Sequence, residues 1–391
     1  MFNRGIEVFR HHIVNANIAG KIRNMTIRYD YQIFCEQPYG GISRYFFELI
    51  QRLQQKPGMH IQLDILSADN IFLEQLRGKT AWNEVQFKGK KDLNRLLSNV
   101  YDSFASRMQP FEIFHPTYYN KSSLSRTAGR PMVITIHDMI DERFHSDKKE
   151  FEPILSVRAK HIQQASKIIA VSQNTRKDLI ELCGVPAEKI ETIYHGNSFE
   201  KNIERRSLTR LIEPDYILYT GKRYAYKNFR RFAESIAPVL KENPTLYLVC
   251  AGGGPFKASE TNLFNLLGIQ GQVVYQPIPT DEELASLYNH AIALVYPSLY
   301  EGFGLPIIEA FACSCPVITS GGSSTGEIAG DAAILIDPNN TNDITEKIRE
   351  VMNNSTLQTE LIQKGHARAA QFNWDKTAQQ TLELYQSLVQ S

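Results

Sequence analysis

The 391-residue chain lacks the features that mark membrane-spanning and nucleic-acid-binding proteins. No apolar run approaches the roughly 18 residues that a transmembrane helix needs, and no continuous apolar stretch of a signal peptide opens the sequence. Lys and Arg total 43 and Asp and Glu 42, so a net charge of +1 gives no global field that attracts nucleic acid. We therefore predict a cytoplasmic protein that binds no nucleic acid and meets any anionic ligand with local charges. Peripheral contact with a membrane stays open.

Cysteine is scarce, with five residues scattered along the chain, mostly in apolar segments. This usage is typical of buried thiols in a reducing compartment. Cys313 and Cys315 form a close pair, but without a second pair or a nearby His they give little support to a metal site.

Three signatures of nucleotide-binding proteins are also missing from the sequence. No G-x-G-x-x-G follows a predicted strand, which removes the main support for a dinucleotide oxidoreductase, and no G-x-x-x-x-G-K-[ST] indicates a P-loop NTPase. No D-x-D occurs, so a metal-bridged nucleotide-sugar site is disfavoured and cationic side chains must do that work. We expect no metal and no other cofactor.

Short apolar segments alternate with helical patterns along most of the chain. An alternation of apolar and polar residues predicts a strand from Ile27 to Ile33, after which Gly40 and Gly41 open a helix. Because strands that alternate with helices form parallel sheets with helices on both faces, the pattern predicts an α/β fold. The further predicted strands are 61–66, 132–136, 167–171, 189–197, 216–220, 245–250, 272–275, 291–296, 316–319 and 333–336, and the helical stretches include 228–240, 281–289 and 375–391.

The length suits two doubly wound, Rossmann-like domains of roughly 150 to 200 residues each. Such domains should face each other across a cleft, because open α/β sheets bind ligands at the carboxyl ends of their strands. A polar, basic segment interrupts the strand and helix pattern and is interpreted as a linker. The predicted divisions are an N-terminal extension (1–24), a first domain (25–197), the linker (198–214), a second domain (215–372) and a C-terminal helix (373–391).

Two carboxylates, Glu301 and Glu309, stand eight positions apart around a glycine-rich turn. Glu309 is the only acidic or basic residue between Gly302 and Gly326. Charges are rarely buried without a partner, so Glu309 is expected to meet a ligand.

Pro306 predicts that a helix runs from Leu305 to Cys313, with its free amides directed at the glycine turn. Two carboxylates so placed can accept hydrogen bonds from one elongated ligand. Glu309 would grip a vicinal diol such as a ribose, and Glu301 the hydroxyls of a second sugar. The alternative is a buried structural Glu beside an ordinary loop Glu.

Three cations, Lys222, Arg223 and Lys227, follow the predicted strand 216–220 at its carboxyl end, where a diphosphate would bind. Arg offers a bidentate fork and Lys a point charge, and together they can neutralise a departing phosphate without a metal. The alternative is a solvated basic loop. After the next strand, the glycine run around Gly253 would let the backbone approach a base or phosphate.

In the first half, His137 ends strand 132–136 and points into the same predicted cleft, with a ring that can bond a sugar hydroxyl. Gly41 opens the first helix and offers backbone amides. The alternatives are a structural His and a tight turn.

With these motifs placed, the chain resembles the retaining family 4 glycosyltransferases of GT-B fold, from about Met25 to the C-terminus. The resemblance rests on a Glu-x7-Glu signature, a G-x-R-x-x-x-K-N phosphate loop, a His-Asp element and an N-terminal glycine loop. The matching residues are Glu301 and Glu309; Gly221, Arg223, Lys227 and Asn228; His137 and Asp138; and Gly40 and Gly41.

The resemblance implies two Rossmann-like domains and a role for each matching residue. It implies that Arg223 and Lys227 bind the donor diphosphate and that Glu309 binds the ribose. Glu301 would hold the donor sugar together with the backbone of Phe303 and Gly304, and His137 would sit near the transferred sugar. The predicted catalytic residues are Glu301, His137, Arg223 and Lys227, and the predicted donor-binding residues are Gly41, Lys222, Gly253, Phe303, Gly304, Leu305 and Glu309.

Two departures from the family pattern matter. Many relatives place Arg directly after the loop glycine, where this chain has Lys222, so the division of labour between Lys222 and Arg223 stays open. Relatives often have Pro before the Glu of a later loop, where Gly326 precedes Glu327, and Glu327 is left without a role.

The sequence thus predicts a metal-independent, retaining glycosyltransferase. It would move a hexose from a nucleotide diphosphate sugar to a glycan or a lipid-linked saccharide. The N-terminal half looks most like relatives that build bacterial surface polysaccharide, often from GDP-mannose. The cluster Lys88, Lys90, Lys91 and Arg95 would either touch an anionic membrane or form a solvated helix face. Alternative hypotheses are a nucleotide-sugar epimerase or phosphorylase of the same fold, and a non-catalytic sugar-nucleotide binder.

Overall fold

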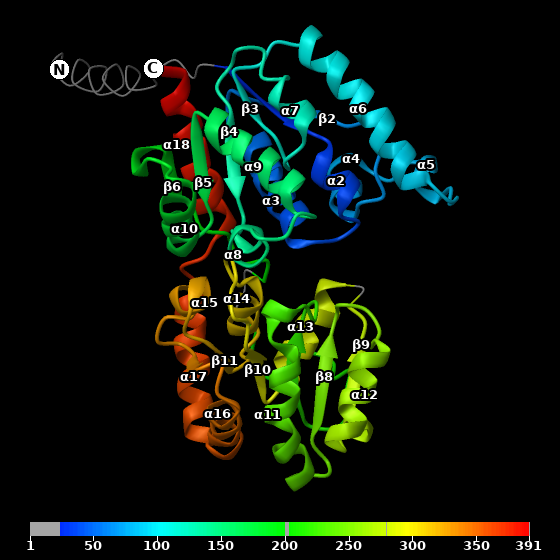
Figure 1. Cartoon of the computed structure of the whole chain (residues 1–391), viewed down its shortest axis with the longest axis vertical. Helices are drawn as coiled ribbons and strands as arrows, with labels where there is room; N and C mark the ends of the chain where they lie inside the picture. The colour runs from blue at the N-terminus through cyan, green and yellow to red at the C-terminus, as the bar shows by residue number, and fades with distance from the viewer. Residues whose placement is uncertain (1–23, 200–202, 279, 391) are drawn as a thin grey trace, which may run out of the picture. The chain divides into compact units, whose positions relative to one another are not determined.

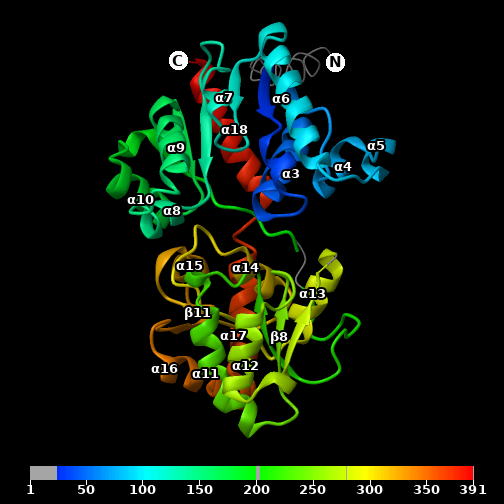
Figure 2. The ribbon, with the colours of Figure 1, turned by 45° about the vertical axis from the view of Figure 1, so that its right-hand side comes forward.

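The computed structural model describes residues 24–199, 203–278 and 280–390. The predicted N-terminal extension lies outside the described residues except for its last position. The chain divides into two compact units (Figures 1 and 2). Unit 1 comprises 1–133, 164–166 and 382–391, and unit 2 comprises 134–163 and 167–381. The domain limits predicted from the sequence differ from these units and stay predictions.

Unit 1 contains a parallel sheet of order β2-β1-β3. Its central strand is buried along most of its length, and Ile27 pairs with Ile61 on one side and with Ile113 on the other. The elements of this unit are β1 (Met25–Asp30), α2 (Gln32–Glu36), α3 (Gly41–Gln54), β2 (Met59–Asp64), α4 (Ile71–Arg77), α5 (Ala81–Glu84), α6 (Lys90–Met108), β3 (Ile113–His115) and α7 (Lys121–Leu124).

The predicted strand from Ile27 to Ile33 is wrong over its last three residues. The strand ends at Asp30, and the short helix α2 begins at Gln32. The Asp30 carboxylate accepts hydrogen bonds from the Thr117 amide (2.9 Å) and hydroxyl (2.7 Å), and its local bonds to Gln32 favour a turn at the strand end. The hydrogen bonds of Asp30 therefore end the strand at this residue, although the alternation of apolar and polar residues continues to Ile33.

A second parallel sheet has the order β4-β5-β6. Ser172 is the N-cap of α10 and accepts a hydrogen bond from the Thr175 amide at 3.0 Å. Gly184 ends that helix in the left-handed conformation. The elements here are β4 (Val133–Ile136), α8 (Ile140–Phe144), α9 (Glu152–Gln164), β5 (Lys167–Ala170), α10 (Gln173–Cys183) and β6 (Ile190–Thr192), so the strand predicted over 189–197 is shorter than expected.

The third sheet, entirely within unit 2, is parallel and six-stranded with the order β12-β11-β10-β7-β8-β9. Its strands are β7 (Tyr216–Thr220), β8 (Tyr247–Ala251), β9 (Val273–Gln276), β10 (Ala293–Tyr296), β11 (Val317–Ser320) and β12 (Ile334–Ile336). The helices are α11 (Phe229–Glu242), α12 (Ala258–Leu267), α13 (Asp281–His290), α14 (Leu305–Ala312), α15 (Ser323–Ala329), α16 (Thr341–Asn353), α17 (Ser355–Ala369) and α18 (Trp374–Gln390).

Successive residues of β7 pack alternately into two hydrophobic cores on opposite faces of this sheet. Tyr216 and Leu218 belong to one core, and Ile217 and Tyr219 belong to the other. A strand buried on both faces needs a continuous apolar run, which explains the sequence YILYT. Strand order reverses between β7 and β10, so the carboxyl ends of these two strands flank a topological switch point, where open α/β sheets bind ligands.

The last helix, α18, has residues in both units. In unit 2, Trp374 packs its indole against the His195 ring at 5.6 Å between centroids. In unit 1, the buried Tyr385 hydroxyl lies 2.9 Å from that of Tyr29 and 2.5 Å from Nδ1 of His115. Each end of the helix is thus held by aromatic and hydrogen-bonding contacts.

Candidate active site at the switch point of the second unit

Lys227 and Glu301 meet at the switch point of the six-stranded sheet. Lys227 follows β7 and Glu301 follows β10, and Lys227 Nζ lies 2.6 Å from Glu301 Oε1. The ammonium also donates to the hydroxyl of Tyr296, the last residue of β10, at 3.2 Å. Both ionic side chains are mostly buried, with 16% and 9% of their surfaces exposed. The ion pair therefore holds Lys227 at the edge where a ligand of this fold binds.

Glu301 is held by its backbone as well as by its side chain. Its amide donates to Ser323 Oγ at 3.2 Å, and the Ser324 hydroxyl donates to the carbonyls of Glu301 and Phe303 at 2.8 and 2.9 Å. Both serines lie in the first turn of α15, so that helix fixes the loop after β10.

The predicted helix after the glycine turn is confirmed, since α14 begins at Leu305 and ends one residue before Cys313. Gly304 caps it with φ of 111°, a conformation that favours glycine. Glu309 is buried in α14, and its Oε2 accepts a hydrogen bond from the Tyr288 hydroxyl at 3.1 Å. The pKa of Tyr288 is raised well above its usual value by burial and by Glu309. The buried carboxylate thus has a protein partner that the sequence did not reveal.

Arg223 is turned toward the glycine loop that follows β8. Its Nε lies 2.6 Å from Glu260 Oε1, and its guanidinium donates to the carbonyls of Gly252 (3.2 Å) and Gly254 (2.8 Å). A Cβ added at Gly253 would lie 2.5 Å from the Gly221 carbonyl oxygen, so the two loops are in direct contact. Arg223 therefore links the glycine loop after β8 (252–254) to the loop after β7 that carries the three cations (221–227, the cation loop).

Lys222, by contrast, is exposed, with Nζ over the ring of Tyr224 at 5.4 Å from its centroid. The structure thus gives the adjacent cations different surroundings. Lys222 faces solvent at the carboxyl end of β7, whereas Arg223 is held by backbone carbonyls and one carboxylate.

This difference leads to a testable prediction. If Arg223 acts by positioning the glycine loop, Arg223→Lys and Glu260→Gln should each weaken nucleoside diphosphate binding by about tenfold, because each loses part of the clamp. If Arg223 contacts the diphosphate directly, Glu260→Gln should tighten binding instead, because it frees a guanidinium. Isothermal titration calorimetry shows whether Glu260→Gln weakens or tightens the binding of nucleoside diphosphate. Glu234→Gln, on the exposed side of α11, is the matched control and should leave the affinity unchanged.

His137, part-buried after β4, belongs to the same unit and lies beside the glycine turn. A Cβ added at Gly302 would fall 1.7 Å from the His137 carbonyl oxygen. Burial lowers the pKa of His137 to about 3, so the imidazole is neutral at pH 7. Its ring centroid lies 5.6 Å from that of His195, whose pKa is also lowered well below its usual value by burial. The structure therefore brings His137 and the Glu301 loop together.

The loop from Glu301 to Gly304 is further fixed by α10 and by aromatic contacts. Ser172 and Thr175 donate to the Gly302 carbonyl at 2.7 and 3.2 Å. Phe303 is buried with its ring 4.8 Å from that of His195. Neither contact is visible in the local sequence, because the partners are more than 100 residues away.

Glu327, which the sequence left without a role, caps helix α10. Its carboxylate accepts hydrogen bonds from the amides of Gln173 (2.8 Å) and Asn174 (3.1 Å) and from the Tyr194 hydroxyl (2.7 Å). Burial, with this bond to Glu327, raises the pKa of Tyr194 to about 12. A carboxylate at a helix N-terminus is a stabilising arrangement, so Glu327 has a structural explanation.

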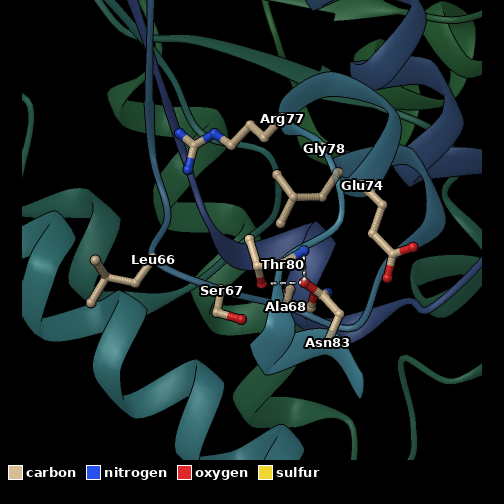
Figure 3. Close-up of a pocket in the computed structure, with 9 residues that line it drawn as sticks. Leu66, Ser67, Ala68, Glu74, Arg77, Gly78, Thr80 and Asn83 are labelled. Carbon is tan, nitrogen blue, oxygen red and sulfur yellow. Dashed lines mark hydrogen bonds between the residues drawn. The ribbon is translucent and has the colours of Figure 1, made fainter. Parts of the chain in front are cut away.

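Gly41 is the first residue of α3 and belongs to unit 1, so its role in donor binding stays a prediction. Unit 1 has a small pocket of about 40 Å³ between α4, α5 and the loop after β2 (Figure 3). A sugar nucleotide needs a pocket of roughly 300 Å³ or more. In the ranges that the structure covers, no cluster of three His, Cys, Asp or Glu residues could hold a metal ion.

Two family models match the chain, and together they span residues 39–368. The model described as Glycosyltransferase Family 4 matches residues 39–200, and that described as Glycosyl transferases group 1 matches residues 200–368. The class that the fold and the comparisons define is that of the glycosyltransferases. Within it, the chain belongs to the family 4 glycosyltransferases of GT-B fold.

Bacterial mannosyltransferases are among the relatives of this chain. O-antigen chain mannosyltransferase B of Escherichia coli is 28% identical over 381 residues, covering 90% of this chain and 97% of that protein. The serotype-specific mannosyltransferase WbdA of Escherichia coli is 22% identical over 354 residues, covering 84% of this chain and 43% of that protein.

Solved structures share the fold. HepE of Anabaena, crystallised in complex with UDP and glucose, has a TM-score of 0.72 at 18% identity and covers 93% of this chain and 100% of that one. At this identity the likeness supports the fold alone. Among the helices that the structure describes, none combines the length and the apolar character needed to cross a bilayer.

Proposed function

We propose that the chain is a retaining, metal-independent mannosyltransferase that takes mannose from GDP-mannose and adds it to a glycan or a lipid-linked saccharide. The observation that carries the proposal is the meeting of Lys227 with Glu301 at the switch point, with Glu309 on the adjoining helix. The similarity to two mannosyltransferases of Escherichia coli supports the choice of sugar. Cytoplasmic location, with peripheral contact with the inner membrane, belongs to the same proposal.

In the proposed reaction, the bond between the anomeric carbon and the diphosphate oxygen breaks, and the acceptor oxygen attacks the same face of the sugar. The acceptor proton passes to the departing diphosphate oxygen. Lys227, together with Arg223 or Lys222, stabilises the negative charge that develops there, where preorganised cations contribute most. Glu309 holds the ribose, Glu301 binds the sugar hydroxyls, and the neutral His137 bonds the transferred sugar.

Metal independence follows from the same groups. Lys227, Lys222 and Arg223 are the cations that could supply the positive charge that a divalent ion supplies in other transferases. The absence of D-x-D from the sequence supports this assignment.

The donor is tested by screening GDP, UDP and ADP sugars for thermal stabilisation of the full chain, followed by mass spectrometry of products with a mannose-containing acceptor. We expect GDP-mannose to stabilise the protein and to yield one added hexose, with or without EDTA, and NMR of the product to show the donor's anomeric configuration. An epimer formed from the donor without acceptor would contradict transfer, as would donor binding with no product. Loss of activity in EDTA would overturn metal independence.

A further inference from the structure

A buried carboxylate of unit 2, Asp178 on α10, joins the two segments that carry the proposed sugar ligands. Its Oδ2 accepts hydrogen bonds from the Tyr300 hydroxyl and from the Asn174 side-chain amide (3.2 Å), and its Oδ1 pairs with the Arg143 guanidinium. The Asp178 side chain has no exposed surface, whereas 36% of the Arg143 side chain is exposed. Three donors, one of them cationic, satisfy the carboxylate, so Asp178 is held in one orientation.

The first of these segments is the loop after β10, in which Tyr300 directly precedes Glu301. Tyr300 is buried, and burial together with its bond to Asp178 raises the pKa of its hydroxyl, which therefore stays a donor at pH 7. Gly302 directly follows Glu301, and its carbonyl accepts two hydrogen bonds from hydroxyls at the N-terminus of α10. Helix α10 therefore holds the loop on both sides of Glu301.

The second segment is α8, which begins three residues after His137. Its first amide donates to the Asp138 carboxylate at 3.1 Å, which ties the start of the helix to the residue next to His137. Arg143, near the end of α8, pairs with Asp178 and lies with its guanidinium carbon 5.4 Å from the centroid of the Tyr300 ring. The ion pair therefore restricts the position of the segment that carries His137.

The groups proposed to bind the nucleotide lie outside this network. In the ranges that the structure covers, Asp178 bonds side chains of α8, α10 and the loop after β10, and none of the cation loop or the glycine loop after β8. Phe144 of α8 packs on Tyr226 of the cation loop, at 6.5 Å between ring centroids, but Asp178 has no part in that contact. Glu309 is held elsewhere, by the Tyr288 hydroxyl. Loss of the Asp178 bonds should therefore displace the sugar ligands and leave the nucleotide ligands in place.

We propose that Asp178 is a positioning residue that holds Glu301 and His137 in place for the donor sugar and contributes little to binding of the nucleotide. It acts through Tyr300 on the loop after β10 and through Arg143 on α8. A reacting group misplaced by about 1 Å can cost roughly 10²-fold in rate, so loss of these connections should lower kcat. The inference rests on the proposed function, which supplies the roles of Glu301 and His137.

Isothermal titration calorimetry with GDP-mannose and with GDP, together with initial rates of transfer, tests the proposal. In Asp178→Asn we expect GDP-mannose to bind about tenfold more weakly and kcat to fall by about 10- to 100-fold, while the affinity for GDP changes by less than about twofold. Glu181→Gln is the matched control, because it removes an exposed charge from the same helix, 3.8 Å from Lys177. The control should change none of the three quantities.

A merely structural Asp178 would give a different result. Asp178→Asn would then unfold at a lower temperature with kcat and the ratio of the two affinities unaltered, and that outcome would overturn the proposal. An equal loss of affinity for GDP and GDP-mannose would overturn it as well. Should Asp178→Asn fail to fold by circular dichroism, Tyr300→Phe replaces it, because this variant removes one hydroxyl and keeps the ion pair with Arg143. The same separation of sugar from nucleotide is expected.

Failure of the proposed function is distinguishable from failure of this inference. If the unaltered protein prefers another nucleotide sugar, that sugar and its nucleoside diphosphate become the two probes, and only the choice of GDP-mannose has failed. If the unaltered protein binds a nucleotide sugar but transfers nothing, the proposed transfer has failed. The affinity of Asp178→Asn for the nucleotide sugar, relative to the diphosphate, then still decides the role of Asp178.

Discussion

Replacing Lys227 by alanine is expected to lower kcat/KM for sugar transfer by about 10²- to 10³-fold, the effect of removing one preorganised group from developing charge. The ammonium is held 2.6 Å from Glu301 Oε1 and 3.2 Å from the Tyr296 hydroxyl, so it is already in place when a diphosphate arrives. A water molecule in its place supplies no charge. Most of the loss should therefore appear in kcat.

Initial rates and calorimetry with nucleoside diphosphate measure this effect. Lys227→Arg keeps the positive charge but replaces a compact ammonium by a planar guanidinium, so its rate should lie between those of the unaltered protein and Lys227→Ala. Lys364→Ala removes an exposed cation from α17 and should change neither rate nor affinity. If Lys227→Ala bound nucleoside diphosphate with unaltered affinity and kept its rate, Lys227 would have no contact with the phosphates.

Replacing Gly302 by alanine is expected to destabilise unit 2 by about 3 kcal/mol, since overpacking against a rigid backbone is costly. The added Cβ would lie 1.7 Å from the His137 carbonyl oxygen and 2.8 Å from Asp138 Cβ, so the loop or β4 must move. Movement of the loop would also displace Glu301. We therefore expect donor binding to weaken along with stability.

Thermal unfolding of the full chain checks this prediction, using the transition that nucleoside diphosphate shifts upward. The matched control is Gly322→Ala, because nothing lies within 4 Å of a Cβ at Gly322 and its φ of −83° suits alanine. The control should unfold within about 3 °C of the unaltered protein, because alanine is a poorer N-cap than glycine but also restricts the unfolded chain. Equal midpoints for the two variants would show that the close approach to His137 is not retained in solution.

Much of the six-stranded sheet could be predicted from the sequence, because each strand buried on both faces is a continuous apolar run. The segment YILYT was predicted over 216–220 and forms β7 over the same residues. The shorter β3 was missed, since three residues carry no readable period. The turn at Asp30 was missed because its bonds reach Thr117, far along the chain.

At the candidate site, sequence spacing identified residues but not their partners. The cation loop was identified because it follows the predicted strand 216–220, and the two carboxylates because they flank the glycine turn after the predicted strand 291–296. The turn of Arg223 toward Glu260 depends on a contact 37 residues away, and the bond from Tyr288 to Glu309 depends on how α13 packs beside α14.

In the proposed enzyme, a diphosphate that binds Lys227 must share the ammonium with the Glu301 carboxylate. A diphosphate that approaches Lys227 competes with the Glu301 carboxylate for the same ammonium, so entry of the donor is opposed by a group of the protein itself. After transfer the same competition acts on the spent nucleotide and hastens its departure. The Lys227–Glu301 ion pair would therefore weaken the binding of donor and spent nucleotide alike, and so would trade affinity for faster exchange of nucleotide at the site.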